Sequence, residues 1–160
     1  MFSLRSTLLS LVIATTSVFA LQCNPPQPGS PVTIQPCSVT ANAWSFNSTT
    51  GLGMFSLKAN PSLCMALGPI YQPSGAPSVV LAKCDWSDYS QRWAWNILPG
   101  PTQLFNGLVG NVMDVFNNEY TPGTQVETYS PNGGLNQAFT WTSQGQIITS
   151  LDNVSCVAVC

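Results

Sequence analysis

The sequence predicts an all-β fold built from three copies of one unit. A short pattern of amide, any residue, aromatic, small residue and aromatic recurs three times, and two further series keep the same spacing. Short runs of alternating apolar and polar residues are typical of strands, and no segment has a long apolar period of 3.6 residues. We therefore expect almost no helix and a closed barrel capped by hairpins, since closure removes exposed sheet edges.

The aromatic motif occupies residues 42–46, 91–95 and 137–141, and it returns about every 47 residues. Its first aromatic residue is Trp44, then Trp93, then Phe139. Large aromatic side chains at equivalent positions fill a shared core. We expect these three residues to be buried around one threefold axis.

Two further series supply the remaining strands. One comprises the β-prone segments 63–67, 111–115 and 155–159. The other comprises turns that contain glycine, each followed by a β-prone run, at 29–32, 75–79 and 123–126. Together the series predict three repeats of about four short strands each.

Residues 1–20 have the pattern of a signal peptide. Arg5 gives a positive start, an apolar stretch follows, and Val18-Phe19-Ala20 suits cleavage after Ala20. A membrane anchor is the alternative, but a span needs about 20 apolar residues. We therefore expect one secreted domain at 21–160, with no membrane insertion after cleavage.

Charge and composition exclude several classes of function. Only 6% of the residues are charged, the net charge is −2, and there are four lysines and arginines in all. Nucleic acid is bound by clustered cations, so it is not an expected partner. There is no histidine, which excludes catalysis by Ser-His-Asp or Cys-His and metal sites that need histidine.

The six cysteines are even in number and lie in the exported part, which predicts three disulfides. Zinc is the alternative, but only Cys156 and Cys160 approach the spacing of a zinc site. We expect no metal and no cofactor. Asn47 and Asn153 begin glycosylation sequons, which matter if the host glycosylates its exported proteins.

The third aromatic motif, Asn136-Gln137-Ala138-Phe139, resembles the Q-x-W motif of the ricin B-type lectins, which are β-trefoils. The resemblance covers nearly all of residues 21–160 and implies a disulfide-stabilised β-trefoil. The phase is unusual, because the chain opens with the second half of a repeat and closes with the first half of one. A circular permutation accounts for this, and a truncated third repeat or a fragment of a longer protein are the alternatives.

The resemblance also implies a disulfide pattern. In the family, a cysteine on the first strand of a repeat bonds one at the start of the loop before Q-x-W. In the repeat without cysteines, these positions fall on Val112 and Tyr129. The implied bonds are Cys64–Cys84, Cys37–Cys156 and, by what remains, Cys23–Cys160.

Family members bind sugar through an aspartate on the first strand, a glutamine and an aromatic residue on the third, and the Asn-Gln pair of the motif. Carried over to one repeat, the corresponding positions are Asp114, Gln125, Glu127, Asn136 and Gln137. The carboxylate and amides would bond adjacent hydroxyls, and the aromatic face would cover the C–H side of the sugar. The alternative for Gln137 is a purely structural bond to the hairpin backbone, and for Asp114 a turn acceptor.

Glu127 occupies the position of the stacking aromatic, and it offers no ring. Phe116 or Tyr120 in the adjoining loop are candidate substitutes. The other two repeats have Ala66 and Ala158 at the aspartate position. We therefore expect one weak site, with an affinity of about millimolar.

The sequence thus predicts a secreted, lectin-like carbohydrate-binding protein with one galactose-type site and no enzymatic activity. Catalysis by Asp114 and Glu127 as a glycosidase pair is a weaker alternative. A further alternative is a trefoil that binds a protein such as a protease through the proline-rich loop 71–77. The chain also fits a non-catalytic binding module of a larger secreted glycoside hydrolase.

Overall fold

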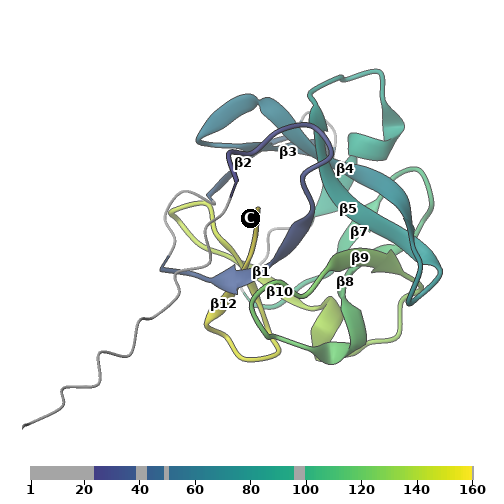
Figure 1. Cartoon of the computed structure of the whole chain (residues 1–160), viewed down its shortest axis with the longest axis vertical. Helices are drawn as coiled ribbons and strands as arrows, with labels where there is room; N and C mark the ends of the chain where they lie inside the picture. The colour runs from purple at the N-terminus through teal and green to yellow at the C-terminus, as the bar shows by residue number, and fades with distance from the viewer. Residues whose placement is uncertain (1–23, 39–42, 49–50, 96–99, 160) are drawn as a thin grey trace, which may run out of the picture.

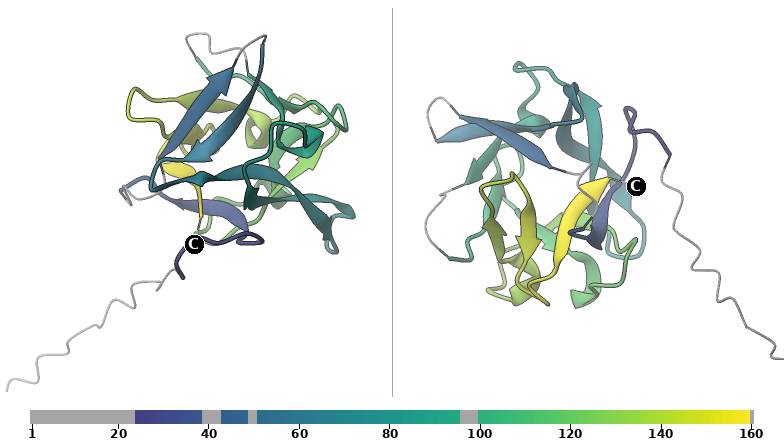
Figure 2. Two further views of the ribbon diagram at one scale, coloured as in Figure 1. Left: turned by 90° about the horizontal axis from the view of Figure 1, so that it is seen from above. Right: turned by 90° about the vertical axis from the view of Figure 1, so that its left-hand side faces the viewer.

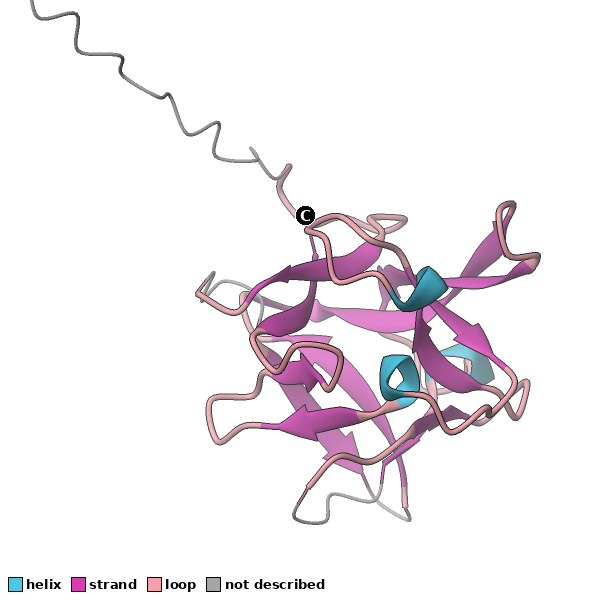
Figure 3. Cartoon of the chain, turned by 90° about the horizontal axis from the view of Figure 1, so that it is seen from below, coloured by secondary structure: helices cyan, strands magenta, loops and turns pink. Residues whose placement is uncertain are grey.

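The structure, a computed structural model, describes residues 24–38, 43–48, 51–95 and 100–159. Within these residues the fold consists of strands, three single turns of 3-10 helix and no α-helix (Figure 3). The all-β prediction is confirmed. No helix in the described part of the chain is long and apolar enough to cross a membrane.

The described strands number twelve, or four for each repeat. Their bounds are β1 Val32–Pro36, β2 Trp44–Ser48, β3 Leu52–Leu57, β4 Asn60–Tyr71, β5 Ala76–Lys83, β6 Trp93–Trp95, β7 Leu104–Asn106, β8 Val112–Val115, β9 Val126–Tyr129, β10 Phe139–Trp141, β11 Ile147–Thr149 and β12 Ser155–Val159. The 3-10 turns are η2 Tyr89–Gln91, η3 Phe116–Asn118 and η4 Leu135–Gln137.

The strands repeat one arrangement three times (Figure 1). Three antiparallel hairpins, β2–β3, β6–β7 and β10–β11, alternate with three antiparallel ladders, β4–β5, β8–β9 and β12–β1. Before the second strand of each ladder the chain turns at Gly29, Gly75 or Gly123, all at positive φ, which glycine adopts without a steric penalty. This threefold arrangement is the predicted β-trefoil.

The two ends of the chain meet in one ladder. β1 and β12 lie side by side (Figure 2), paired from Val32 opposite Val159 to Pro36 opposite Ser155. The Cys37–Cys156 disulfide fastens this ladder across a sequence separation of 119 residues. The first and last parts of the described chain therefore complete one repeat together.

The hydrophobic core draws on all three repeats and includes the repeated aromatic residues. Trp44, Trp93 and Phe139 are each fully buried, as predicted. The indole N–H of Trp44 donates to the carbonyl of Val157 at 2.9 Å, and that of Trp93 donates to the carbonyl of Met65 at 3.1 Å. These two carbonyls stand at equivalent points of β12 and β4, so the buried indoles are satisfied in the same way.

Two of the three expected disulfides are confirmed, namely Cys37–Cys156 and Cys64–Cys84. Cys23 and Cys160 lie outside the described residues, as does the segment 1–20 that we interpret as a signal peptide. Both sequon asparagines, Asn47 and Asn153, are exposed.

Candidate functional site

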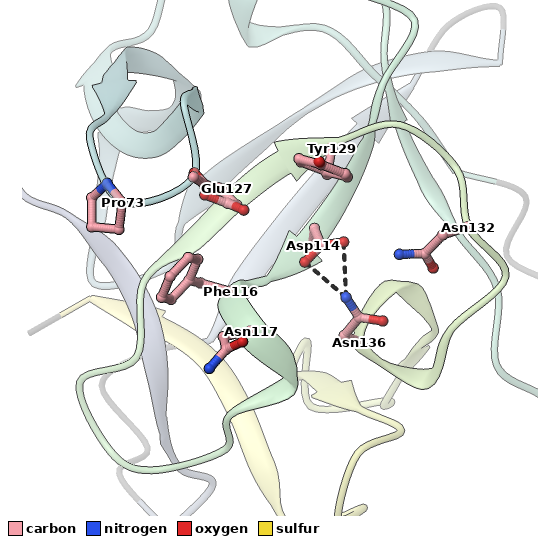
Figure 4. Close-up of a pocket in the computed structure, with 9 residues that line it drawn as sticks. Pro73, Asp114, Phe116, Asn117, Glu127, Tyr129, Asn132 and Asn136 are labelled. Atoms are coloured by element: carbon pink, nitrogen blue, oxygen red, sulfur yellow. Dashed lines mark hydrogen bonds between the residues drawn. The ribbon is translucent and has the colours of Figure 1, made fainter.

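An open pocket of about 340 Å³ lies over the β8–β9 ladder. It takes one wall from the β4–β5 hairpin, another from η3, and a third from the loop that leads into η4 (Figure 4). Its lining residues are Pro73, Ser74, Asp114, Phe116, Asn117, Glu127, Tyr129, Asn132 and Asn136. Three segments far apart in the sequence therefore build one site.

The floor of the pocket is the carboxylate of Asp114, which two amides hold in place. The Asn136 amide nitrogen donates to both carboxylate oxygens at 2.9 Å, and that of Gln137 donates to Oδ2 at 2.7 Å. Burial raises the pKa of the Asp114 carboxyl, while the bonds from Gln137 and Asn136 lower it. A carboxylate accepts about four hydrogen bonds, so three leave capacity for a ligand.

Gln137 supports this site from below. It is fully buried, it does not line the pocket, and its side chain also bonds the carbonyl of Ser130 at 2.9 Å and the N–H of Asn132 at 2.7 Å. Gln91, at the equivalent position, bonds nearby backbone in the same manner: its side-chain oxygen accepts from the N–H of Asp85, and its side-chain nitrogen donates to the carbonyl of Lys83. The amide of the motif is therefore structural in both repeats, and in one of them it also positions Asp114.

Glu127 faces Asp114 directly across the β8–β9 ladder. It is 3% exposed, and its Oε2 accepts a hydrogen bond from the hydroxyl of Ser74 in the β4–β5 hairpin. Burial raises the pKa of the Glu127 carboxyl, the Ser74 bond lowers it, and the negative charge of Asp114 raises it further. Two carboxyl groups thus share the floor of the pocket.

The ladder register corrects the alignment of this repeat. Asp114 pairs with Glu127, and its counterpart Ala66 pairs with Val80. Counted from these pairs, Cys84 corresponds to Pro131 and not to Tyr129. The sequence alignment was wrong by two residues because it counted back from the motif across the preceding loop, and the length of that loop differs between the repeats.

The corrected register places an aromatic residue where the sequence alignment had Glu127. Tyr129 takes that position and lines the pocket together with Phe116. The ring of Phe116 is itself supported by Tyr71, which packs edge-on against it at a centroid distance of 5.1 Å. Tyr120 is 56% exposed and is not among the lining residues.

Gln125 does not join the pocket, contrary to our expectation that it would lie beside Asp114. Its amide nitrogen donates to the carbonyls of Val32 at 3.1 Å and Val79 at 3.2 Å. These carbonyls belong to the two other repeats, so Gln125 ties the three repeats together near the axis. Its place at the site is taken by Glu127 in the corrected register.

The two other repeats lack this chemistry. Ala66 pairs with Val80 and Ala158 pairs with Thr33, so no carboxylate stands at the equivalent point of either ladder. In the described part of the chain, no group of three or more metal-ligating side chains is present. The pocket residues that sequence reasoning missed are Pro73, Ser74, Asn117, Tyr129 and Asn132. Pro73 and Ser74 come from the neighbouring repeat, and no local pattern could have linked them to Asp114.

Comparison with known proteins identifies the fold. No protein-family model matches the chain, and no curated protein sequence does. The chain is similar to a designed 3-fold symmetric protein, ThreeFoil, with 19% identity and a TM-score of 0.62 over 71% of this chain and 81% of that one. At this level of identity the likeness concerns the fold, which is a β-trefoil.

Two larger solved structures are similar as well. The PSL1a-E64 complex matches with 17% identity and a TM-score of 0.52 over 83% of this chain. A Polyporus squamosus lectin bound to a human-type influenza-binding epitope matches with 16% identity and a TM-score of 0.47 over 84% of this chain. This chain spans 43% and 44% of those two chains.

Proposed function

We propose that this protein is an exported carbohydrate-binding protein with one sugar site, in the pocket over the β8–β9 ladder. The observation that carries the proposal is the Asp114 carboxylate, fixed by two amides at the floor of an open pocket lined by Tyr129 and Phe116. A sugar needs a firm acceptor for its hydroxyls and an apolar surface for its C–H face, and the pocket offers both. The resemblance to ricin B-type lectins suggests a sugar of the galactose type.

In this proposal one sugar hydroxyl donates to the remaining acceptor site of Asp114. Hydrogen bonds to an ionised group are about twice as strong as neutral ones, so this contact sets the orientation of the sugar. The exposed ring of Tyr129 covers the apolar face of the sugar. A single monosaccharide in an open pocket makes few contacts, so we expect an affinity of about millimolar, near −4 kcal/mol.

We infer that the site binds rather than catalyses. Asp114 already accepts three hydrogen bonds, and these hold its carboxylate in place instead of freeing it to attack or to transfer a proton. The two confirmed disulfides support export, because such bonds persist in oxidising compartments. The pairing of β1 with β12 supports a circularly permuted ricin B-type trefoil, in which the ends complete a repeat.

A glycan array on residues 21–160, followed by titration of the best ligand, tests the proposal. Tyr129→Ala should weaken binding by about fivefold, the contribution of one aromatic face. Asp114→Ala should abolish binding, and circular dichroism should show that it folds, since alanine occupies this position in both other repeats. Tyr120→Ala, which removes another exposed ring that does not line the pocket, is the matched control.

Wild-type affinity in both Tyr129→Ala and a folded Asp114→Ala would overturn this assignment of the site. An array with no bound glycan, together with inhibition of a protease, would favour a protein partner. The hairpin tip that would serve such a partner is already engaged in the described structure, where Ser74 bonds Glu127 and Tyr71 packs on Phe116.

A further inference from the structure

The pocket carries negative charge that no cation in its lining offsets. Asp114 and Glu127 both line it, and its lining contains no lysine or arginine. Two of the chain's few cations are occupied elsewhere: Lys58 donates to the carbonyl of Gln144 at 2.7 Å, and Arg92 lies over the ring of Tyr89. The negative charges of Asp114 and Glu127 are therefore not neutralised by a cation in the pocket lining.

The fold does not need this pair. At the equivalent points of the other two ladders the partners are Ala66 with Val80 and Ala158 with Thr33. Like charges directly opposite one another in an antiparallel ladder are destabilising. Burial is the largest cause of the raised pKa of the Glu127 carboxyl, and repulsion from the charge of Asp114 adds to it. A ligand that brings positive charge would relieve the repulsion between Asp114 and Glu127.

A hydrogen bond from another repeat also fixes the orientation of the Glu127 side chain. The hydroxyl of Ser74 donates to its Oε2, and Ser74 stands on the hairpin of another repeat. The Ser74 hydroxyl is in turn near the carbonyl of Tyr71 and accepts from the N–H of Ala76 at 3.2 Å. The carboxylate is thereby fixed toward the pocket beside Asp114, as Figure 4 shows.

We propose that the pocket selects a sugar that bears a protonated amine, such as a 2-amino-2-deoxyhexose, and seats its ammonium group between the carboxylates of Asp114 and Glu127. This inference rests on the proposed function, because it takes the pocket as a sugar site. An ammonium group offers three donors, and charge-assisted bonds to carboxylates are the strong ones. The apolar face of the sugar ring lies against Tyr129 in the same pose.

Calorimetric titration with matched sugars tests the inference on the protein without its first twenty residues. Galactose, galactosamine and N-acetylgalactosamine differ only at one position, as a hydroxyl, an ammonium and a neutral amide, and glucose and glucosamine form a second pair. Near pH 7 and at low salt, each amino sugar should bind about tenfold more tightly than its hydroxyl partner. N-acetylation should remove that gain, and high salt should reduce it.

The variant Glu127→Gln keeps the volume of the side chain and removes one charge. We expect the ratio of amino-sugar to hydroxyl-sugar affinity to fall from about ten to about two. Asp88→Asn removes one charge from a loop outside the pocket and keeps a residue that can cap η2, so it should leave the ratio unchanged.

The outcomes separate the two proposals. Equal binding of amino and hydroxyl sugars by the wild-type protein overturns the charge selection and leaves the sugar site in place. A preference for the amino sugar that is as large in Glu127→Gln as in the wild type also overturns it. Binding of none of the five sugars overturns the proposed function, and the inference falls with it.

Discussion

Asp114 is held in its pocket by Asn136 and Gln137, whose own positions depend on contacts with the surrounding backbone. Gln137 is buried beneath it, and Asn136 bonds both of its oxygens. Gly134 makes room for this arrangement, because a Cβ at that position would stand 2.3 Å from the Asn136 side-chain oxygen. The site is thus prepared before any ligand arrives, which reduces the entropy lost on binding.

The pH dependence of the free energy of unfolding tests how much the buried negative charge of Glu127 destabilises the fold. Its pKa is raised in the folded protein above the value of about 4.3 found in unfolded chains, so the folded state binds the proton more tightly. The associated stability is fully present at acid pH and is lost as the pH rises through the folded pKa. Glu127→Gln should therefore be more stable than the wild type at neutral pH and equally stable in acid.

Urea unfolding of both proteins across this pH range provides the measurement. Asp114 is the charged residue that faces Glu127 in the ladder, and its own raised pKa acts in the same direction in both proteins. A wild-type protein that is the more stable of the two at neutral pH would contradict the raised pKa of Glu127, which burial and the charge of Asp114 cause.

At the scale of elements, one hairpin and one ladder are repeated three times around a shared aromatic core. Trp93→Ala should lower the free energy of unfolding by roughly 3–5 kcal/mol, the usual cost of removing a large buried aromatic side chain. Trp93→Phe should cost much less, because Phe139 fills the equivalent place in the third repeat. Most of that smaller cost, about 1 kcal/mol, is the indole bond to the carbonyl of Met65.

Chemical denaturation of the two variants gives both values. An Ala variant with a wild-type unfolding midpoint would show that Trp93 is not a core residue. A Phe variant as unstable as the Ala variant would show that the third repeat packs differently from the second.

The β4–β5 hairpin illustrates how an element of one repeat serves another. β4 has twelve residues, the longest strand described, and its ladder with β5 continues to its far end, where Tyr71 pairs with Ala76. There Ser74 reaches Glu127 and Tyr71 reaches Phe116. The proline-rich segment that the sequence suggested as a protein-binding loop is therefore a wall of the pocket in the structure.

At the scale of the whole molecule, the Cys37–Cys156 bond joins the two ends of the described chain. In the chain-entropy view, a bond that closes more than 100 residues adds about 4–5 kcal/mol, and one that closes about 20 adds about 3. Replacing both Cys37 and Cys156 by serine should therefore lower stability more than replacing both Cys64 and Cys84. Thermal unfolding of the two double variants under identical conditions compares them.

A larger loss from the Cys64–Cys84 pair would mean that local packing and not loop closure governs these bonds. Loss of the Cys37–Cys156 bond should also loosen the β1–β12 ladder in particular. Hydrogen exchange at Thr33 and Ala158, which pair with each other in that ladder and are both buried, would report this.

The sequence alone determined the fold, because repetition and alternation are local patterns that survive in a single chain. The aromatic motif located core residues at Trp44, Trp93 and Phe139, and the resemblance to the ricin B-type lectins implied two disulfides that the structure confirms. Asp114 was identified as the distinctive carboxylate because its counterparts in the other repeats are alanines. Each of these inferences depends on a residue type at a repeated position.

Only the tertiary structure decided how the pocket is assembled. The register of the β8–β9 ladder placed Tyr129 and Glu127, where counting across a loop of different length misplaced both by two residues. Gln125 proved to bond the backbone of other repeats, and Ser74 arrived from a distant hairpin. The strand register and the contacts between repeats are set by packing in three dimensions. The spacing of residues along the sequence does not reveal either of them.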